Sequence, residues 1–442
     1  MLFDHADAFS NRPTAPFPLD FGATATRTHS IITLPYGTLW RTLRCSLTAD
    51  ILHPTRLGLL EPLQRDAIRG LVADLGDAAG QVVVVRDSLR RAMYALMAHL
   101  CFGDDGVDAG DVGAVYRAQL EFFAAYAGAK AVEGSRLPRL LYWRRWLRFQ
   151  AAFDRVSELV ITLIAARRRV LLAQRGCGGG GGGGGMLPYV DSLLNLRVPD
   201  GGDERVNARR MLTDKEMAPL VWEFIVAGTE TVVICVEWAL AHLVAQPEVQ
   251  NKLHREVAGV EREGFVPEEN LRSMPYLRAV VLECLRLHPP VPFILREAGT
   301  HQGAAVGIGG GAAVPASGMT TTLFRLRASE IGRNREAWTD PDEFLPDRFV
   351  AGGEGEGVGP VPGPKVEIKM MPFGAGRRYC PGAGLGMVHI GCVLAALVRE
   401  FEWAPPAEGG GGGVVVDLTE LDVFFKVMKT PLRARIPPRR RS

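Results

Sequence analysis

One short stretch of this sequence carries the residues best suited to chemistry. It reads FGAGRRYCPG and spans residues 373–382. We expect Cys380 at the N-cap of a helix and Pro381 at its first position, because apolar residues follow at helical spacing to about Leu397. The positive end of the helix would stabilise a Cys380 thiolate by roughly 0.3–2 kcal/mol and favour its ionisation. Such a sulfur can bind iron.

The same ten residues resemble the signature of cytochromes P450, Phe-x-x-Gly-x-Arg-x-Cys-x-Gly, and match it at every defined position. The resemblance implies that Cys380 is the axial thiolate ligand of a haem b iron. Phe373, Gly374 and Gly382 would belong to the haem-binding loop, and Arg378 could pair with a haem propionate. Thiolate ligation favours O–O cleavage and therefore indicates oxygen activation. The alternative interpretation is that Cys380 is an ordinary buried cysteine.

A second constellation, AGTET at residues 227–231, falls near the middle of a long predicted helix. Ala227 and Gly228 add little bulk, so the helix could pass close to a haem face. The motif resembles the oxygen-activation motif of the same family, which implies that Glu230 and Thr231 together relay protons. The alternative is a contact between helices through small residues, with one solvated glutamate.

A third pattern, ECLR at residues 283–286, resembles the Glu-x-x-Arg element of the family. Glu283 and Arg286 share a helix face, and their apolar neighbours predict that the pair is buried. A buried guanidinium has donors for further partners. Arg348, in the PDRF segment at residues 346–349, is the expected third member of a structural network that supports the haem loop.

Two weaker signals concern the haem propionates. Trp40 and Arg44 lie four residues apart, on one face of a predicted helix that resembles the family's Trp-Arg-x-x-Arg helix. The resemblance implies that both contact a propionate. Arg296 follows a proline-rich turn, where the family often has another propionate-binding residue. The alternative for Arg296 is an ordinary surface arginine.

The elements that must position these residues are mainly helical, with a small irregular β region between Ala298 and Thr322. A long helix is expected from the capping box at Thr213 to about Val244. Pro247 and Pro275 should begin shorter helices. Glycine runs predict exposed loops at residues 176–186 and 407–413. Hydrophobic periodicity predicts further helices at residues 38–50, 58–75, 84–102, 112–128, 145–175 and 382–400.

Composition excludes several classes of protein. The 442 residues are 47% hydrophobic and 23% charged, as in a globular protein with a large core. The 51 basic and 49 acidic residues leave a net charge of +2, so there is no single-sign field for nucleic acid. Seven scattered cysteines lack zinc-ligand spacing and indicate a reducing compartment. The most apolar stretch, residues 220–245, carries three glutamates and is interpreted as a core helix.

The resemblance extends from about Pro35 to Pro431 and predicts a single catalytic domain over residues 1–442. Residues 40–54 (WRTLRCSLTADILHP) and 224–231 (FIVAGTET) are most similar to plant microsomal members. Such members sit at the cytosolic face of the endoplasmic reticulum membrane. Their hydrophobic anchor and hinge are missing from this sequence, so we expect membrane attachment only through a segment that this chain lacks.

The family also implies the activity and its partners. The expected reaction is the hydroxylation or epoxidation of a small apolar substrate with O2 and electrons from NADPH. The sequence has no dinucleotide-binding fingerprint, so the electrons should come from a separate NADPH-cytochrome P450 reductase. Two alternatives are a haem-thiolate isomerase or dehydratase acting on lipid hydroperoxides, and an inactive truncated remnant. The Glu230-Thr231 pair argues against the former.

Overall fold

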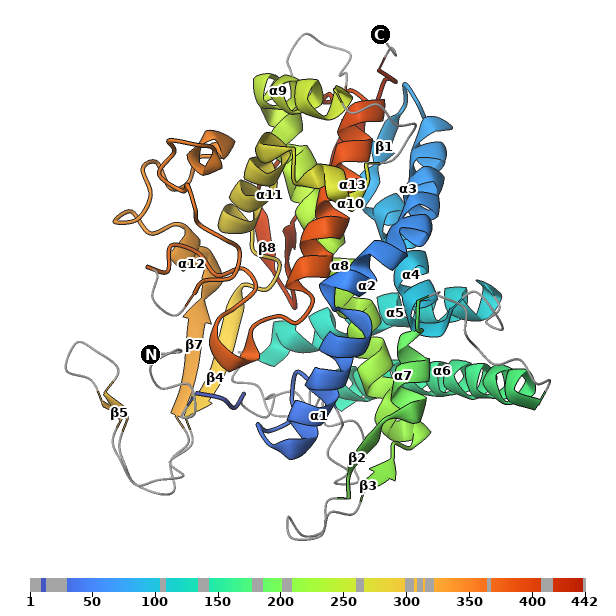
Figure 1. The fold of residues 1–442 in the computed structure, drawn as a ribbon. Coiled ribbons are helices and arrows are strands. Elements are labelled where there is room, and N and C mark those ends of the chain that lie inside the picture. The colour runs from blue at the N-terminus through green and yellow to red at the C-terminus, as the bar shows by residue number, and fades with distance from the viewer. Residues whose placement is uncertain are drawn as a thin grey trace. The chain divides into compact units, whose positions relative to one another are not determined.

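The chain is mainly helical in the computed structural model (Figure 1). The structure describes residues 9–12, 30–103, 109–133, 143–176, 186–200, 209–259, 266–298, 306–307, 313–314, 322–363, 367–406 and 416–439. The helices are α1 (Thr38–Ser46), α2 (Pro54–Leu57), α3 (Glu61–Gly76), α4 (Val85–Phe102), α5 (Ala109–Glu133), α6 (Trp143–Gly176), α7 (Tyr189–Asn195), α8 (Asp214–Ala245), α9 (Pro247–Ala258), α10 (Glu268–Leu271), α11 (Pro275–Leu287), α12 (Ala328–Gly332) and α13 (Ala383–Glu400). The strands are β1 (Val82–Val84), β2 (Arg197–Pro199), β3 (Arg209–Met211), β4 (Phe293–Ala298), β5 (Val306–Gly307), β6 (Ala313–Val314), β7 (Thr322–Arg327), β8 (Glu420–Asp422), β9 (Lys426–Met428) and β10 (Arg433–Arg435).

The fold consists of two compact units, each built from three stretches of chain. One comprises Met1–Arg56, Met97–Ala227 and Leu295–Phe324. The other comprises Leu57–Leu96, Gly228–Ile294 and Arg325–Ser442. The second unit therefore holds the cysteine loop, Glu230, Thr231 and the Glu283 network, whereas Trp40, Arg44, Ala227 and Arg296 belong to the first.

The starts of α8, α9 and α11 agree with the local signals of the sequence. Thr213 and Glu216 form the predicted capping box in front of α8: the Thr213 N–H donates to Glu216 Oε2 over 2.8 Å, and the Glu216 N–H donates to Thr213 Oγ1 over 3.3 Å. Pro247 and Pro275 are the first residues of α9 and α11. The first predicted helix is confirmed as α1, which continues as a π-helical segment at Leu47–Ile51.

Two long apolar helices contribute to the core. By length and composition, both α8 and α13 could cross a membrane, but 83% and 67% of their most apolar windows are buried inside the structure. Both carboxylates in the second half of α8, Glu230 and Glu237, are 2% or less exposed and paired with arginines. The interpretation of residues 220–245 as a core helix is confirmed.

The sheets are small and two-stranded. β4 pairs with β7, and β5 pairs with β6 in antiparallel register, which places strands in the predicted β region. β8 and β9 form a hairpin-like pair, while β1 pairs with β10 near the end of the chain. The loops predicted at residues 176–186 and 407–413 lie outside the described residues, except for Gly176 and Met186 at the two ends of the first.

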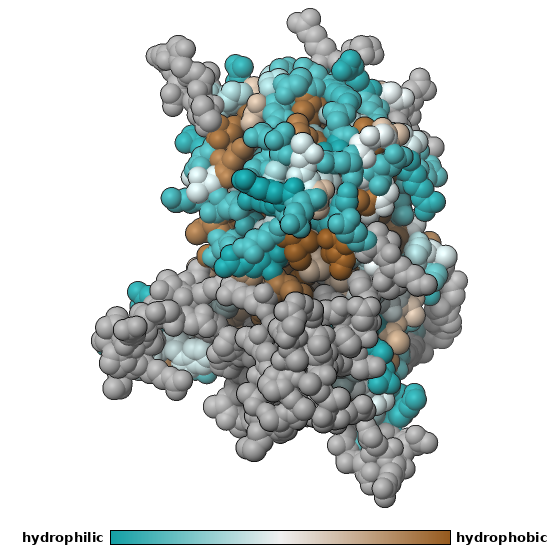
Figure 2. All heavy atoms as spheres, turned by 90° about the vertical axis from the view of Figure 1, so that its left-hand side faces the viewer, coloured by the Kyte–Doolittle hydropathy of each residue, from teal (hydrophilic) through white to brown (hydrophobic). Residues whose placement is uncertain are grey.

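Figure 2 shows a face on which hydrophilic residues cover most of the described surface and hydrophobic residues emerge in separate patches. Exposed large hydrophobic side chains come from different elements, for example Val82 of β1 and Leu421 of β8. Single exposed apolar residues are normal on a folded protein.

Candidate active site

The cysteine loop is a turn that its own backbone closes. The Cys380 N–H donates to the Phe373 carbonyl over 2.8 Å and joins the two ends of the loop. Between them, Gly374 and Gly376 have φ angles of +73° and +68°, a left-handed backbone that residues with a Cβ rarely adopt. Arg378 closes a 3-10 turn and is only 3% exposed. The glycines are therefore required by the shape of the loop.

The expected N-cap was wrong by two residues. α13 begins at Ala383 with Gly382 as its N-cap, and the Gly386 N–H makes the first intrahelical bond, 2.8 Å long, to the Gly382 carbonyl. Cys380 and Pro381 precede the helix because the bond from Cys380 back to Phe373 holds the cysteine in the loop. A Cβ on Gly382 would lie 4.0 Å from Cys380 Sγ, so glycine leaves one side of the sulfur uncrowded.

Cys380 differs from the buried cysteines in its exposure. Its exposure is intermediate, whereas Cys101, Cys235, Cys284 and Cys392 are buried. Burial raises the pKa of Cys392 to about 12 and raises the pKa of the other three buried thiols as well. The interpretation of Cys380 as an ordinary buried cysteine is therefore wrong.

The middle of α8 has an open strip of small residues. Ala227 is exposed, and Gly228 and Thr231 are half-buried, although Val226 and Thr229 beside them are buried. Residues three and four apart share a helix face. Positions 227, 228 and 231 therefore form one strip, where little side-chain bulk would obstruct a flat group lying against the helix.

Glu230, which immediately precedes Thr231, is buried and not solvated. Its side chain is 2% exposed, and its Oε2 accepts hydrogen bonds from Arg90 Nε over 3.2 Å and from an Arg90 terminal nitrogen over 3.0 Å. The alternative of a solvated glutamate in a plain helix contact is wrong for this residue. The structure thus pairs Glu230 with an arginine of α4 and leaves Thr231 on the open strip.

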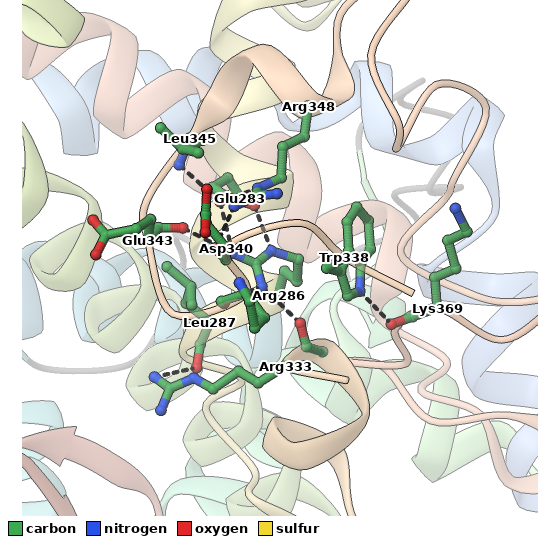
Figure 3. A network of polar contacts seen from close by, with 12 residues as sticks. Glu283, Arg286, Leu287, Arg333, Trp338, Asp340, Glu343, Leu345, Arg348 and Lys369 are labelled. Carbon is green, nitrogen blue, oxygen red and sulfur yellow. Dashed lines mark hydrogen bonds and ion pairs between the residues drawn. The ribbon is translucent and has the colours of Figure 1, made fainter. Parts of the chain in front are cut away.

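The predicted network around Glu283 is present and fully buried (Figure 3). Arg286 donates from Nε to Glu283 Oε2 over 2.6 Å and from a terminal nitrogen to Oε1 over 2.8 Å. Arg348 Nε and the Leu345 N–H also donate to Oε1, over 3.2 and 2.8 Å. The Arg286 guanidinium uses its remaining donors on the carbonyls of Gly332, Pro341 and Glu343.

A chain of contacts leads from this network toward the cysteine loop. The Arg286 guanidinium lies over the Trp338 ring, 5.3 Å from its centroid. Trp338 Nε1 donates to the Lys369 carbonyl over 3.0 Å, and Lys369 lies four residues before Phe373 (Figure 3). These contacts give the network a physical route by which to support the segment that enters the loop.

The three remaining candidates belong to the first unit. Trp40 is 4% exposed, and its indole N–H donates to the Ile31 carbonyl over 3.0 Å. The Arg44 guanidinium stacks over the Trp40 ring at 5.5 Å, which confirms that the two side chains share a face. Arg296 is 1% exposed and donates to the Leu295 carbonyl, so the alternative of a surface arginine is wrong.

The sequence did not reveal the partners of the buried acids in α8. Arg86 and Arg90 of α4 pair with Glu237 and Glu230. A buried carboxylate needs a partner, so a counter-charge could have been expected. The sequence nevertheless holds 51 Lys and Arg residues, and nothing local selects these two.

A buried histidine pair was also missed. The Nε2 atoms of His242 and His288 lie 2.8 Å apart, and His288 Nδ1 lies 2.8 Å from Glu420 Oε1. Burial lowers the pKa of His288 to about 4. Partial burial acts to raise the pKa of Glu420, but the hydrogen bonds that Glu420 makes with His288 and Lys426 outweigh this effect and lower its pKa to about 2.

Comparison with known proteins agrees with these observations. The family model described as Cytochrome P450 matches residues 1–411. Cytochrome P450 89A9 of Arabidopsis thaliana is 34% identical over 93% of this chain and 77% of its own length. Cytochrome P450 78A3 of Glycine max is 32% identical over 92% of this chain and 72% of its own length. The chain belongs to the cytochrome P450 family.

Solved structures show the same fold. A retinoic acid-bound cyanobacterial CYP120A1 is 20% identical, has a TM-score of 0.71, and the match covers 93% of this chain and 81% of that protein. The heme domain of a cytochrome P450DA mutant is 18% identical, with a TM-score of 0.74 over all of this chain and 86% of that domain. The predicted mainly α P450 fold is confirmed.

Membership of this family implies a haem whose iron is bound by a cysteine thiolate, and the described residues fit such a group. A porphyrin supplies four of the iron ligands itself, so the protein needs to offer a single sulfur. Cys380 is only partly buried, and Gly382 leaves space beside its sulfur. Among the described residues, no three His, Cys, Asp or Glu side chains gather as a metal site of another kind.

Proposed function

We propose that this chain is a haem-dependent monooxygenase that hydroxylates or epoxidises a small apolar organic substrate with O2 and electrons derived from NADPH. The observation that supports this most strongly is Cys380, which is only partly buried and lies in a loop shaped by glycines directly before α13. When bound there, a haem with thiolate ligation supplies oxygen activation. We propose that residues 1–442 act as a single catalytic domain.

Each candidate residue has a proposed role toward this group. Cys380 binds the iron, and Phe373, Gly374 and Gly382 shape the loop around the sulfur. Ala227 and Gly228 keep the face of α8 clear for a flat macrocycle and for substrate. Three arginines bind the propionates because charge-assisted, forked hydrogen bonds suit carboxylates. They are the buried Arg296 and Arg378 and the half-buried Arg44, with Trp40 as a fourth contact.

Glu230 and Thr231 are proposed to move protons. Thr231 stands on the open strip of α8, where its hydroxyl can pass a proton to a reacting oxygen. Glu230, one residue earlier, is a buried carboxylate that can take up and release that proton. An isomerase or dehydratase that uses no external electrons needs no such pair, and this argues against that alternative.

The partners follow from the reaction. Electrons are proposed to come from a separate NADPH-cytochrome P450 reductase, and the substrate is a small organic molecule. We place the reaction at the cytosolic face of the endoplasmic reticulum membrane, because residues 40–54 and 224–231 resemble those of plant microsomal members.

The experiment tests Cys380 as the iron ligand and the monooxygenase reaction separately. The full chain is expressed with haem, and the reduced protein is examined under carbon monoxide. We expect the strongly red-shifted Soret band of thiolate ligation in the wild type and its loss in Cys380→Ala. A Cys392→Ala variant controls for removal of a thiol, because Cys392 lies on α13, the helix that follows Cys380.

The reconstituted protein is then incubated with reductase, NADPH, 18O2 and a metabolite extract. Products that gain one labelled oxygen support a monooxygenase. Rearrangement of a lipid hydroperoxide without NADPH would favour the isomerase class, and failure to bind haem would indicate an inactive remnant. Retention of the red-shifted band in Cys380→Ala would exclude this ligand.

A further inference from the structure

Three polar side chains form a hydrogen-bonded chain inside the second unit. His242 lies on α8, His288 is the C-cap of α11, and Glu420 is the first residue of β8. The Nε2 atoms of His242 and His288 are 2.8 Å apart, and His288 Nδ1 is 2.8 Å from Glu420 Oε1. The chain therefore joins two helices to the hairpin that β8 forms with β9.

Aromatic rings hold both imidazoles in place. The His288 ring stacks on Trp238, with the two centroids 3.8 Å apart and the planes 1° apart. The His242 ring stacks on Phe344 at 4.2 Å and 6°. Both histidines are buried, with 6% of His242 and 4% of His288 exposed. Because stacking fixes the plane of each ring, the facing nitrogens cannot move apart unless the packing opens.

Cations around Glu420 decide which atom donates to it. Lys426 Nζ donates to Glu420 Oε2 over 2.5 Å, and an Arg333 terminal nitrogen donates to Oε1 over 2.7 Å. Although burial acts to raise the pKa of Glu420, its hydrogen bonds hold it at about 2, so the carboxylate is ionised. An ionised carboxylate can only accept hydrogen bonds. His288 Nδ1 is therefore the donor in its bond to Glu420.

This first bond fixes the direction of the second. A neutral imidazole has one N–H donor and one acceptor nitrogen. Since His288 uses Nδ1 as its donor, its Nε2 accepts, and His242 must donate from Nε2. Each bond of the chain then contains one proton, and both histidines are neutral.

The surroundings favour neutral histidines. The charged groups that face the two rings are three cations and one anion: Arg286, Arg333, Lys426 and Glu420. Arg286 is paired with Glu283, and Lys426 Nζ also lies 3.4 Å from Asp422 Oδ1. Burial lowers the pKa of His288 to about 4 and the pKa of His242 well below its usual value of 6.5. An added proton is therefore disfavoured as long as the chain stays packed.

We propose that His242, His288 and Glu420 form a histidine latch, which fixes the β8–β9 hairpin to α8 and α11 at neutral pH and releases it in acid. When the hairpin opens, water reaches His288, and the ring regains its ordinary affinity for a proton. The Glu420 side chain is 22% exposed and the His288 side chain 5%, so Glu420 lies at the solvent end of the latch. Solvent supplies the proton and takes it back when the latch closes. The latch does not depend on the proposed reaction.

The pH dependence follows from proton linkage. The closed latch holds the pKa of His288 at about 4, whereas a histidine in water has a pKa of about 6.5. The open form therefore binds a proton more readily than the closed form. Lowering the pH from 7 to 5 should raise the population of the open form about twentyfold through His288 alone.

Hydrogen exchange of the full chain tests this release. The Lys426 amide donates to the Pro290 carbonyl over 2.9 Å, so its exchange reports whether the hairpin is held against the segment after α11. After correction for the intrinsic exchange rate, we expect its protection to fall by about twentyfold or more between pH 7 and pH 5. The β2–β3 pair of the first unit is the internal control and should change much less. An equal fall in both pairs, or no fall in the hairpin, would overturn the proposal.

Two variants separate the hydrogen-bond donor from the titrating group. In His242→Gln, the amide Nε2 can replace the imidazole Nε2 as donor but does not titrate. We expect nearly wild-type protection of the hairpin at pH 7 and a smaller fall at pH 5. His242→Leu leaves His288 Nε2 without a donor, so its hairpin should be about tenfold less protected already at pH 7. Equal protection in His242→Leu and wild type at pH 7 would show that the chain does not hold the hairpin.

Nuclear magnetic resonance of the wild type tests the direction of the chain without any variant. With 15N-labelled histidine, we expect a scalar coupling across the hydrogen bond between the two Nε2 atoms, with the proton attached to His242. A proton on His288 Nε2, or no coupling between these nitrogens, would overturn the proposed latch.

Discussion

Replacement of Arg286 by methionine tests the buried network most directly. The side chain makes five hydrogen bonds, two to Glu283 and three to the carbonyls of Gly332, Pro341 and Glu343. Neither Glu283 nor Arg286 has any exposed side-chain surface. Methionine has a similar length and no charge, so Arg286→Met removes the donors and leaves most of the volume filled.

The expected loss of stability follows from this geometry. Glu283 would retain only the Arg348 Nε and Leu345 N–H donors, with no bidentate partner. Loss of one partner of a buried ion pair costs about 3–5 kcal/mol, and the orphaned carbonyls add to this cost. Since folded proteins are stable by only about 5–15 kcal/mol, we expect Arg286→Met to fold poorly and to retain little haem.

A matched control lies on α12 and its N-cap. Arg327 and Glu330 are also three residues apart and form an ion pair, but their side chains are 58% and 63% exposed. Exposed pairs contribute about 0–1 kcal/mol, so Arg327→Met should change the free energy of unfolding little. Urea unfolding followed by intrinsic fluorescence, with haem content from the Soret absorbance, measures both variants. Equal losses in the two variants would refute the reasoning from burial.

Two further predictions concern stability. Burial holds the pKa of His288 at about 4, below its usual value of about 6.5; the folded state therefore binds fewer protons than the unfolded state, and stability falls as pH drops from about 6.5 to about 4. Burial also lowers the pKa of His389, to about 4. We therefore expect His288→Phe, which can keep the stacking on Trp238 at 3.8 Å, to reduce the slope of the unfolding free energy against pH without abolishing it. An unchanged slope would contradict the assignment of this pH dependence to His288. Gly386→Ala should stabilise α13 by about 0.5–1 kcal/mol, because its Cβ would meet the Phe373 ring at an ordinary 3.5 Å; a lower melting temperature would show that the space is not available.

The sequence predicted what local chemistry controls. The cysteine loop was recognised from its motif because it is one contiguous stretch, and the bond that closes it joins residues only seven positions apart. The capping box at Thr213 and the prolines that begin α9 and α11 likewise act within one turn of helix. Glu283 and Arg286 are three residues apart, so their spacing also predicted that they share a helix face.

Tertiary structure decided which charges meet and which residues are covered. Arg90 lies 140 positions from Glu230, and Arg86 lies 151 positions from Glu237. No local signal joins them, because each pairing depends on how α4 packs against α8. Packing likewise decides the burial of Arg296. Hydrogen bonds between near neighbours are set by the chain itself, whereas the partner of a buried charge is set by the surface that the folded chain brings against it.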